Sequence, residues 1–448
     1  MVEATTAWMG PGMFVMALAC LLLGYPVAFT LGGVAVLFAG VGIAAGVFSE
    51  SFLAALPQRV FGIMGNFTLL AIPAFIFMGA MLKNSGLAEQ LLEAMGRVLG
   101  QLRGGLALAV VLVGALLAAT TGVVAATVIT MGLISLPTML RHGYDKSLAT
   151  GVIAASGTLG QIIPPSIVLV VLGDQLGVPV GDLFIGSVIP GLLMTVVFAL
   201  YVLVITWCRP NLAPPLPAGG DGRFPGQELR QAAPLVLPPL ALIVLVLGSI
   251  FFGVATPTEA GAMGAVGAMA MAAWKGRLSL GTIREVSEET LSTTSMVMFI
   301  LLGSTAFSLV FRGFDGDSLI AALLLRLPGE SAGFLIISMA TIFLLGFFID
   351  FFEIAFIVVP LFAPVAKTLF GPEALVWYGV IIGANLQSSF LTPPFGFALF
   401  YLRSVAPPQV TTGHIYHGVI PFILLQMLVL LLIIVFPQLV TALPHLVA

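Results

Sequence analysis

A glycine-broken segment that ends in two prolines, SGTLGQIIPPS at residues 156–166, is the feature that most constrains this chain. A proline lacks the backbone N–H, clashes with the preceding helical turn and disfavours helical geometry in the residue before it. A helix entering this segment must therefore stop before Pro164 and leave backbone carbonyls unpaired. Within a bilayer, such carbonyls are tolerated only inside the protein or beside a cavity. The segment is therefore predicted to form part of a binding site.

The composition shows that this segment lies in a membrane protein. The 448 residues are 60% hydrophobic and 8% charged, whereas a globular domain is about 25% charged. Apolar runs of about 20 residues, the length that crosses a bilayer, recur along the chain. The formal net charge of -3 offers no basic surface for nucleic acid. We therefore expect an all-α polytopic protein embedded in a lipid bilayer that does not bind nucleic acid.

A second segment of the same kind, NLQSSFLTPPFG, occupies residues 385–396. Each of the two follows an apolar stretch with a small or polar interruption near its middle. The first stretch, 104–139, is interrupted at Thr120-Thr121-Gly122, and the second, 333–366, is interrupted between Gly346 and Glu353. The length of each stretch suits two half-helices, which predicts two re-entrant hairpins. A hairpin followed by a broken helix, present twice, is typical of a secondary transporter.

The connections between these units predict how the chain is divided. The loop at 208–231 is rich in proline, glycine and charge and separates two halves. We predict a charged interfacial segment at 52–64, a comparable one at 275–290, and an amphipathic surface helix within 86–105. The predicted parts are N-terminal scaffold helices at 1–51, a first repeat at 52–207 (hairpin 104–139, broken helix 147–177), linker and scaffold helices at 208–277, and a second repeat at 278–440 (hairpin 333–366, broken helix 372–403).

The basic residues predict the orientation of these parts. A unit in which the hairpin enters and leaves by one face crosses the membrane three times, and two linking spans make the second copy inverted. With that path, Arg59, Arg312, Arg326 and Lys367 fall on one face and the other lysines and arginines on the opposite face. The basic excess marks the cytoplasmic face. Both termini are therefore expected outside, in the periplasm.

The small polar residues at the hairpins and breaks predict two sodium sites. Carbonyl and hydroxyl oxygens without a full charge suit a sodium ion that has lost its water. The first predicted site comprises Thr120, Thr121, Gly122, Ser156, Gly157, Thr158, Gly160, Ile163 and Pro164, and the second comprises Gly346, Asp350, Asn385, Gln387, Ser388, Ser389, Thr392 and Pro393. The alternative is that Ser, Thr and Gly only allow the helices to pack closely.

Two acidic residues, Asp350 and Glu353, interrupt the second apolar stretch. A charge there costs about 3 kcal/mol on insertion scales, so these carboxylates could contact a cation, carry a proton, or only shape a hairpin tip that reaches the aqueous vestibule. The half-helices that begin after the two breaks point positive dipole ends inward, which suits a carboxylate substrate. The predicted substrate residues are Ser166, Glu353, Phe395 and Gly396.

Other chemistries find little support. The two cysteines have no CxxC or Cys/His spacing, the four histidines have no metal spacing, and no glycine-rich phosphate loop is present. We therefore expect no catalytic residues, no cofactor and no transition metal, with Na⁺ as the coupling ion.

Four runs of the sequence resemble one known family closely. They are AIPAFIFMGAMLKNSGLAEQLLEAMGR, ATTGVVAATVITMGLISLPTMLRHGYDKSLATGVIAASGTLGQIIPPSIVLVVLGD, LFIGSVIPGLLM and NLQSSFLTPPFGFALFYLR. Together they resemble the large membrane subunit of tripartite ATP-independent periplasmic (TRAP) transporters, over nearly the whole chain. The last run looks like the branch associated with mannitol or chloroaromatic compounds.

That resemblance implies a sodium-coupled importer of the bacterial inner membrane with the elevator fold of ion transporters. It also implies two partners, a small four-helix membrane subunit and a soluble periplasmic substrate-binding protein. Many relatives have a serine-rich first tip followed by an acidic residue, whereas this chain has Thr120-Thr121-Gly122 and then Ala125-Ala126. Backbone carbonyls are therefore the ligands expected there.

These observations predict the sodium-driven import of a small organic acid. Two alternatives remain open at this stage. The first is a proton-coupled carrier of organic anions that uses Asp350. The second, of a different class, is an intramembrane enzyme.

Overall fold

The computed structural model describes residues 8–216, 225–394 and 396–447, and no strand occurs in these ranges. Eight of the described helices are long and apolar enough to cross a membrane. Large apolar side chains on their outer faces are exposed, including Phe29, Leu192, Val244 and Leu424. Such a surface suits lipid, since soluble monomers rarely expose apolar patches of this extent. The predicted all-α polytopic class is confirmed.

The first half of the chain contains a helical hairpin followed by an interrupted helix. Its elements are α2 (Met9–Leu22), α3 (Val27–Ala44), η1 (Glu50–Ala54), α4 (Ala55–Met64), η2 (Phe67–Leu70), α5 (Ala71–Asn84), α6 (Leu87–Leu99), α7 (Gly105–Thr121), α8 (Val124–Arg141), α9 (Lys146–Thr158), η3 (Leu159–Gln161), α10 (Ile167–Leu176), α11 (Val180–Cys208) and η4 (Pro210–Leu212).

The second half repeats this order after two linking helices. Its elements are α12 (Pro225–Phe251), α13 (Pro257–Trp274), α14 (Leu280–Gly313), α15 (Gly316–Leu325), α16 (Ser331–Leu345), α17 (Phe351–Glu353), the π-helical turn η5 (Ile354–Val358), α18 (Val359–Phe370), α19 (Leu375–Leu391), α20 (Phe397–Val405), α21 (Thr412–Val435) and α22 (Gln438–Val447).

The first hairpin is formed by α7 and α8. Gly122 ends α7 with φ +60°, a left-handed conformation that glycine adopts without steric cost, and Val123 is extended before α8 begins. Pro137 lies inside α8, which continues to Arg141, so the hairpin ends slightly later than predicted.

A short turn joins the hairpin to α9. The Asp145 carboxylate accepts from the Leu148 N–H at 2.9 Å and caps the first turn of α9. The Tyr144 hydroxyl accepts from the Leu106 N–H at 3.2 Å, and burial raises the pKa of this phenol. The turn Gly143-Tyr144-Asp145 therefore connects the start of the hairpin with the start of α9 through hydrogen bonds.

Both predicted breaks are present. In the first, α9 and η3 end at Gln161 and α10 begins at Ile167, and the Ser166 hydroxyl donates to the Gln161 carbonyl at 2.8 Å across the gap. In the second, α19 ends at Leu391 and α20 begins at Phe397. Each break contains a cis peptide bond between its two prolines.

Further boundaries differ from the sequence-based expectation. Residues 275–290 were expected to form a separate interfacial segment, but residues 280–313 form one continuous helix, α14, of 34 residues. The reason is local: the Ser279 hydroxyl caps its start, and no glycine or proline interrupts residues 282–302. In addition, α12 begins at Pro225, inside the stretch 208–231 that was expected to be a loop, and α22 continues past residue 440, where the second repeat was expected to end.

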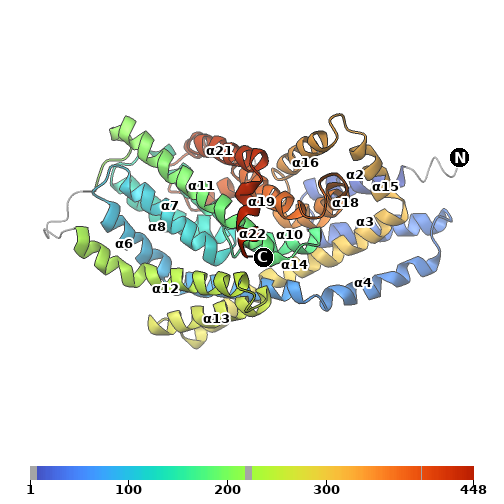
Figure 1. The fold of residues 1–448 in the computed structure, drawn as a ribbon, viewed down its shortest axis with the longest axis horizontal. Helices are drawn as coiled ribbons and strands as arrows, with labels where there is room; N and C mark the ends of the chain where they lie inside the picture. Colours follow the sequence, from blue (N-terminus) through green and yellow to red (C-terminus); the bar gives the residue numbers. More distant parts are fainter. Residues whose placement is uncertain (1–7, 217–224, 395, 448) are drawn as a thin grey trace.

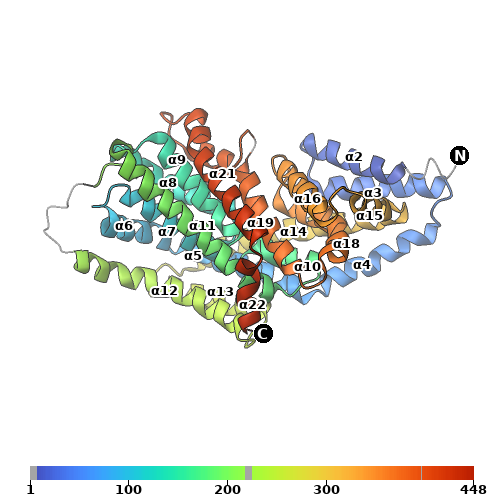
Figure 2. The same ribbon diagram turned by 45° about the horizontal axis from the view of Figure 1, so that its top comes forward.

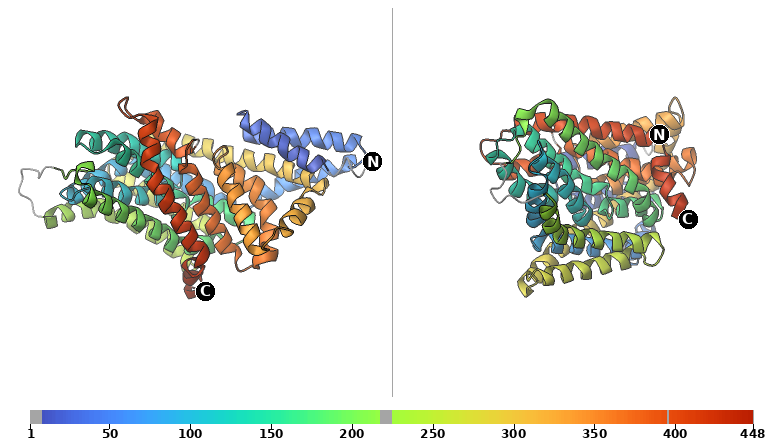
Figure 3. Two further views of the ribbon diagram at one scale, coloured as in Figure 1. Left: turned by 90° about the horizontal axis from the view of Figure 1, so that it is seen from above. Right: turned by 60° about the vertical axis from the view of Figure 1, so that its left-hand side comes forward.

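The two hairpins lie on opposite sides of the molecule. Figures 1 and 2 show α7 and α8 on the left and α16 and α18 on the right, with α10 and α19 between them. The linking helices α12 and α13 contact each other and run along one edge, where Figure 3 shows them in yellow-green. The interrupted helices are therefore central, as two inverted repeats require. The amphipathic α6 has its apolar side covered by α7 and α12.

Candidate functional site

The first hairpin packs directly on the first break. A methyl group at Gly157 of α9 would lie 3.2 Å from the Cα of Val128 in α8, and one at Gly160 would lie 3.2 Å from the Ala118 carbonyl oxygen in α7. At the tip, a methyl group at Gly122 would lie 3.4 Å from the backbone nitrogen of Ile167. The tip therefore reaches the start of α10, where the chain resumes its helix.

The second hairpin makes the matching contact with the second break. A methyl group at Gly346, which ends α16, would lie 2.8 Å from the Cβ of Ser389 in α19. The buried Asn385 donates from Nδ2 to the Met339 carbonyl of α16 at 2.8 Å. Each hairpin therefore contacts its own interrupted helix through small residues.

Hydroxyl groups at both breaks, buried apart from the partly buried Thr392, donate their hydrogens to carbonyls three or four residues earlier in the chain. Those of Ser156 and Thr158 donate to the carbonyls of Val152 and Ala155, at 2.6 and 2.8 Å. Those of Ser388, Ser389 and Thr392 donate in the same way, at 3.2, 2.8 and 2.7 Å. A hydroxyl oxygen whose hydrogen is engaged keeps lone pairs for another donor or a cation.

The two interrupted helices meet at a buried polar cluster of Thr158, Gln387 and Gln426. The Thr158 hydroxyl oxygen accepts from Nε2 of Gln387 at 3.4 Å and from Nε2 of Gln426, in α21, at 3.1 Å. All three side chains are fully buried, and the Oε1 atoms of both glutamines have no hydrogen-bond partner among the described residues. The cluster joins a residue predicted for the first site to one predicted for the second.

Sequence reasoning missed two members of this region, Gln161 and Gln426. Gln426 is the one amide side chain in the apolar helix α21, which is a usable signal because a polar side chain within a membrane span rarely lacks a role. Gln161 is fully buried at the edge of the first break, and in the described part of the chain neither of its side-chain polar atoms has a hydrogen-bond partner.

The other predicted residues are placed as follows. A methyl group at Gly191 of α11 would lie 2.9 Å from Cγ1 of Ile163, so this side chain contacts α11. The fully buried Ser166 uses its hydroxyl within the break. Gly396 is buried at the start of α20, and Pro164, Thr392 and Pro393 lie within the breaks themselves. Phe395 and the side chains of Thr120 and Thr121 lie outside the described atoms.

Asp350 and Glu353 form a capping box at the start of the second arm of the second hairpin. Oδ1 of Asp350 accepts from the Phe351 N–H at 2.7 Å, and Oε2 of Glu353 accepts from the Asp350 N–H at 3.1 Å. The spacing D-x-x-E is a known helix-start signal and could have been recognised in the sequence. Both carboxylates therefore stabilise the backbone at the tip of the second hairpin.

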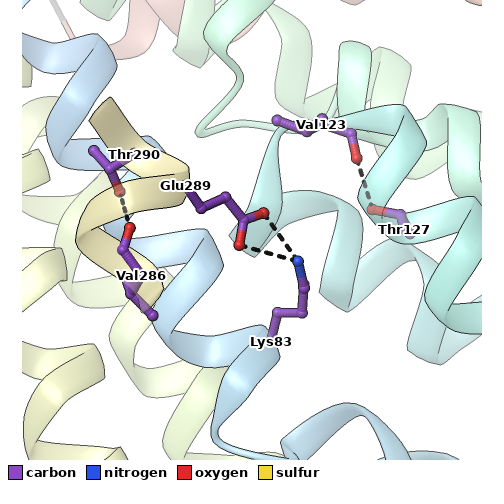
Figure 4. Close-up of polar contacts among 6 residues, drawn as sticks. All are labelled: Lys83, Val123, Thr127, Val286, Glu289 and Thr290. Carbon is purple, nitrogen blue, oxygen red and sulfur yellow. Dashed lines mark hydrogen bonds and ion pairs between the residues drawn. The ribbon is translucent and has the colours of Figure 1, made fainter. Parts of the chain in front are cut away.

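A cross-helix ion pair lies between α5 and α14. The Lys83 ammonium is 2.9 and 3.1 Å from the two carboxylate oxygens of Glu289, and Figure 4 draws this pair together with the first turn of α8, where the Thr127 hydroxyl donates to the Val123 carbonyl at 3.1 Å. Both charged side chains are about one-third exposed, at 31% and 36%. An ion pair of this exposure contributes little stability.

The described residues contain no group of three or more His, Cys, Asp or Glu side chains placed to hold a metal ion. The oxygen-lined clusters at the breaks remain the candidate cation sites.

Paired hairpins, paired interrupted helices and buried oxygen clusters define this protein as a polytopic membrane transporter of the inverted-repeat class. The chain belongs to the family described as the tripartite ATP-independent periplasmic transporter, DctM component, which it matches over residues 14–439. The expected family is thereby confirmed, and the chain is a multi-pass protein of the inner membrane.

Several relatives carry names of transport proteins. The C4-dicarboxylate TRAP transporter large permease protein of Pseudomonas aeruginosa is 32% identical over 400 residues, covering 89% of this chain and 91% of that protein. The sialic acid TRAP transporter large permease protein of Vibrio cholerae is 30% identical and covers 100% and 99% of the two chains. These names identify a transport protein and not an enzyme.

A more distant solved structure shares the fold. The YdaH transporter of Alcanivorax borkumensis superposes with a TM-score of 0.62 at 16% identity, covering 88% of this chain and 90% of that one. At this identity the similarity concerns the fold alone.

Proposed function

We propose that this protein imports a small organic acid across the inner membrane, driven by sodium, as the large subunit of a tripartite system. The observation that carries the proposal is the matched contact of each hairpin with its own interrupted helix, Gly122 with Ile167 and Gly346 with Ser389. Both contacts lie beside buried hydroxyls whose hydrogens are already engaged. Two clusters of hydroxyl and carbonyl oxygens, the second with the single carboxylate of Asp350, suit two monovalent cations.

In the proposed mechanism, Na⁺ orders both hairpin tips before the substrate binds. The hairpins and interrupted helices then slide together across the remaining helices, as in an elevator. The predicted termini are periplasmic, and the predicted partners are a small four-helix membrane subunit and a soluble periplasmic receptor. A relative from Oleidesulfovibrio alaskensis supports the first partner: it is named the isethionate TRAP transporter permease protein DctMQ, and this chain spans 62% of its length.

The substrate class follows from the helix ends and from the relatives. The helices α10 and α20 begin at the two breaks, where their backbone N–H groups favour an anion. C4-dicarboxylate and sialic acid, the compounds in the names of two relatives, both carry carboxylates. A small carboxylate is therefore the proposed substrate, with Ser166, Glu353, Phe395 and Gly396 as its proposed contacts.

The first test measures uptake in proteoliposomes that contain the chain, its small subunit and its receptor. An inward sodium gradient is expected to drive accumulation of the receptor's ligand, and replacing sodium by potassium should abolish it. Accumulation that continues unchanged without a sodium gradient would reject the coupling.

The second test removes the charge of Asp350 but keeps its cap. Asparagine caps a helix as well as aspartate does, so Asp350→Asn should fold. Loss of a carboxylate ligand worth about 1.4 kcal/mol would raise the half-saturating sodium concentration of uptake about tenfold, with the pH dependence of uptake unchanged.

The matched control is Asp145→Asn, because Asp145 caps α9 in the same way outside the candidate site. This variant should keep the sodium dependence of the unaltered protein. If Asp350→Asn instead abolishes the pH dependence of uptake, Asp350 carries a proton and the protein is the proton-coupled carrier.

A further inference from the structure

A cavity of about 470 Å³ is lined by residues of several helices. Its lining residues come from α4, η2 and α10 of the first half and from α14, η5, α18 and α19 of the second half. None of its lining residues belongs to the predicted cation or substrate sets. Its volume lies within the range of about 300–1,000 Å³ that holds small-molecule ligands.

The charge of this cavity is positive. Three basic side chains line it, from Arg59, Arg312 and Lys367. Among the described residues, neither Arg59 nor Lys367 has a carboxylate within ion-pair distance, and Arg312 Nε lies 4.0 Å from Oδ2 of Asp317. Two of the three cations therefore have no counter-ion in the described part of the protein.

The one acidic side chain in the lining, Asp174, is already engaged. Its Oδ1 accepts from Asn66 Nδ2 at 2.5 Å and its Oδ2 from Gln175 Nε2 at 2.7 Å. The Asp174 carboxylate is therefore satisfied by neutral amide donors, and these hydrogen bonds do not neutralise the arginine and lysine side chains of the cavity. The cavity thus has a surplus of cationic donors for an anion.

Neutral donors complete the lining on a single face of α14. Ser304, Ser308 and Arg312 follow one another at intervals of four residues, about one turn of that helix, and Thr305 is next to Ser304 in the cavity lining. The Ser304 hydroxyl donates to the Phe356 carbonyl in η5. The hydroxyls of Thr305 and Ser308 are partly exposed and face the cavity beside the arginine. A guanidinium, an ammonium and hydroxyl groups around one space are the donors that carboxylates accept from.

We propose that this cavity is a second anion site, which binds a small mono- or dicarboxylate before it reaches the hairpin tips. The inference rests on the proposed function for the identity of the anion, and it adds a separate station on the face predicted to be periplasmic. Its recognition comes from Arg59, Arg312 and Lys367, with Ser308 in the lining.

The test measures the charge of the cavity without measuring transport. The test uses a chain in which both native cysteines are removed, by Cys20→Ala and Cys208→Ala, and Ser308→Cys provides the reporter. This variant is reconstituted in proteoliposomes with the small subunit. It is then labelled either by the anionic sulfonatoethyl methanethiosulfonate or by the cationic trimethylammonium-ethyl methanethiosulfonate. Labelling is followed by the mass of this chain. Neutralising Arg59 and Lys367 to glutamine should lower the anionic-to-cationic rate ratio by about five- to tenfold for each charge at low salt, as a charge about 7 Å away in water would.

The control is Arg326→Gln, because Arg326 is on the same predicted face but outside the cavity lining. It should leave the rate ratio unchanged. Succinate or pyruvate should slow anionic labelling more than chloride at equal ionic strength, and this protection should vanish in the Arg59→Gln/Lys367→Gln variant. An unchanged ratio in that variant, or equal protection by chloride, would overturn the proposed site, and Thr305→Cys provides a second reporter if Ser308→Cys does not fold.

Uptake distinguishes this inference from the proposed function. The double variant should raise the substrate concentration for half-maximal uptake about tenfold while leaving the sodium dependence unchanged. Loss of sodium dependence in the unaltered protein, with labelling as expected, would reject the sodium coupling and leave the anion site intact.

Discussion

Replacing Gly151 by alanine is expected to destabilise the folded protein by about 3 kcal/mol, the upper end of the cost of overpacking a core. A methyl group at Gly151 of α9 would lie 2.5 Å from the carbonyl carbon of Gly418 in α21 and 3.0 Å from its Cα. Both residues are buried, and the atoms that the methyl group meets are backbone. The two helices would therefore have to move apart. Small residues at helix contacts in membranes allow the close approach that the methyl group would block.

The measurement for Gly151→Ala is thermal unfolding of the purified protein, with size-exclusion chromatography to report folded material. Gly33→Ala in α3 is the matched control, because a methyl group there meets no atom within 4 Å. Alanine favours a helix over glycine by about 1 kcal/mol, so the control should be neutral or stabilising. Equal stability of the two variants would contradict the close contact of α9 and α21.

Replacing Thr158 by valine is the second change expected to have a large effect. Valine keeps the shape of threonine but cannot accept a hydrogen bond, so the Nε2 groups of Gln387 and Gln426 would lose their shared partner. Each unpaired buried donor costs about 1–3 kcal/mol. The expected result is a loss of about 2–5 kcal/mol in stability and a fall of at least about tenfold in sodium-driven uptake.

Thr195→Val provides the comparison for that variant. The buried Thr195 hydroxyl donates only to the Gly191 carbonyl of its own helix, at 2.9 Å, and has no cross-helix partner in the hydrogen bonds of the described residues. This variant should therefore lose much less stability than Thr158→Val. If the two variants unfold at the same temperature, the buried cluster between the interrupted helices makes no special contribution.

The interruptions of the fold were predictable from sequence because their causes are local. The Pro164-Pro165 pair removes backbone donors, and Gly122 supplies the left-handed turn of the first hairpin, so the breaks and tips follow from a few neighbouring residues. The continuity of α14 was mispredicted because the change from charged to apolar residues near residue 290 resembles the end of a segment. A change from charged to apolar residues marks a change of surroundings and does not end a helix.

The candidate site was predictable in part. Small residues of each hairpin and break do meet, as at Gly160 with Ala118 and at Gly346 with Ser389. The cluster around Thr158 was not predictable, because its partners lie 229 and 268 residues away along the chain. Ligation of sodium by these residues stays a prediction, as do the division into domains and the substrate contacts.

The length of α14 has a mechanical consequence. At 1.5 Å per residue, its 34 residues span about 51 Å, whereas a bilayer with its headgroups is about 40–45 Å thick. A straight rod of that length must tilt by about 30° to end at both surfaces, and a thinner bilayer increases the tilt. Glu289, which pairs with Lys83, and Arg312, which lines the basic cavity, are both carried by this one rod. A change in bilayer thickness therefore changes the tilt of α14 and moves Glu289 and Arg312 at the same time. Reconstitution in lipids of different chain length would shift both ends of this helix together.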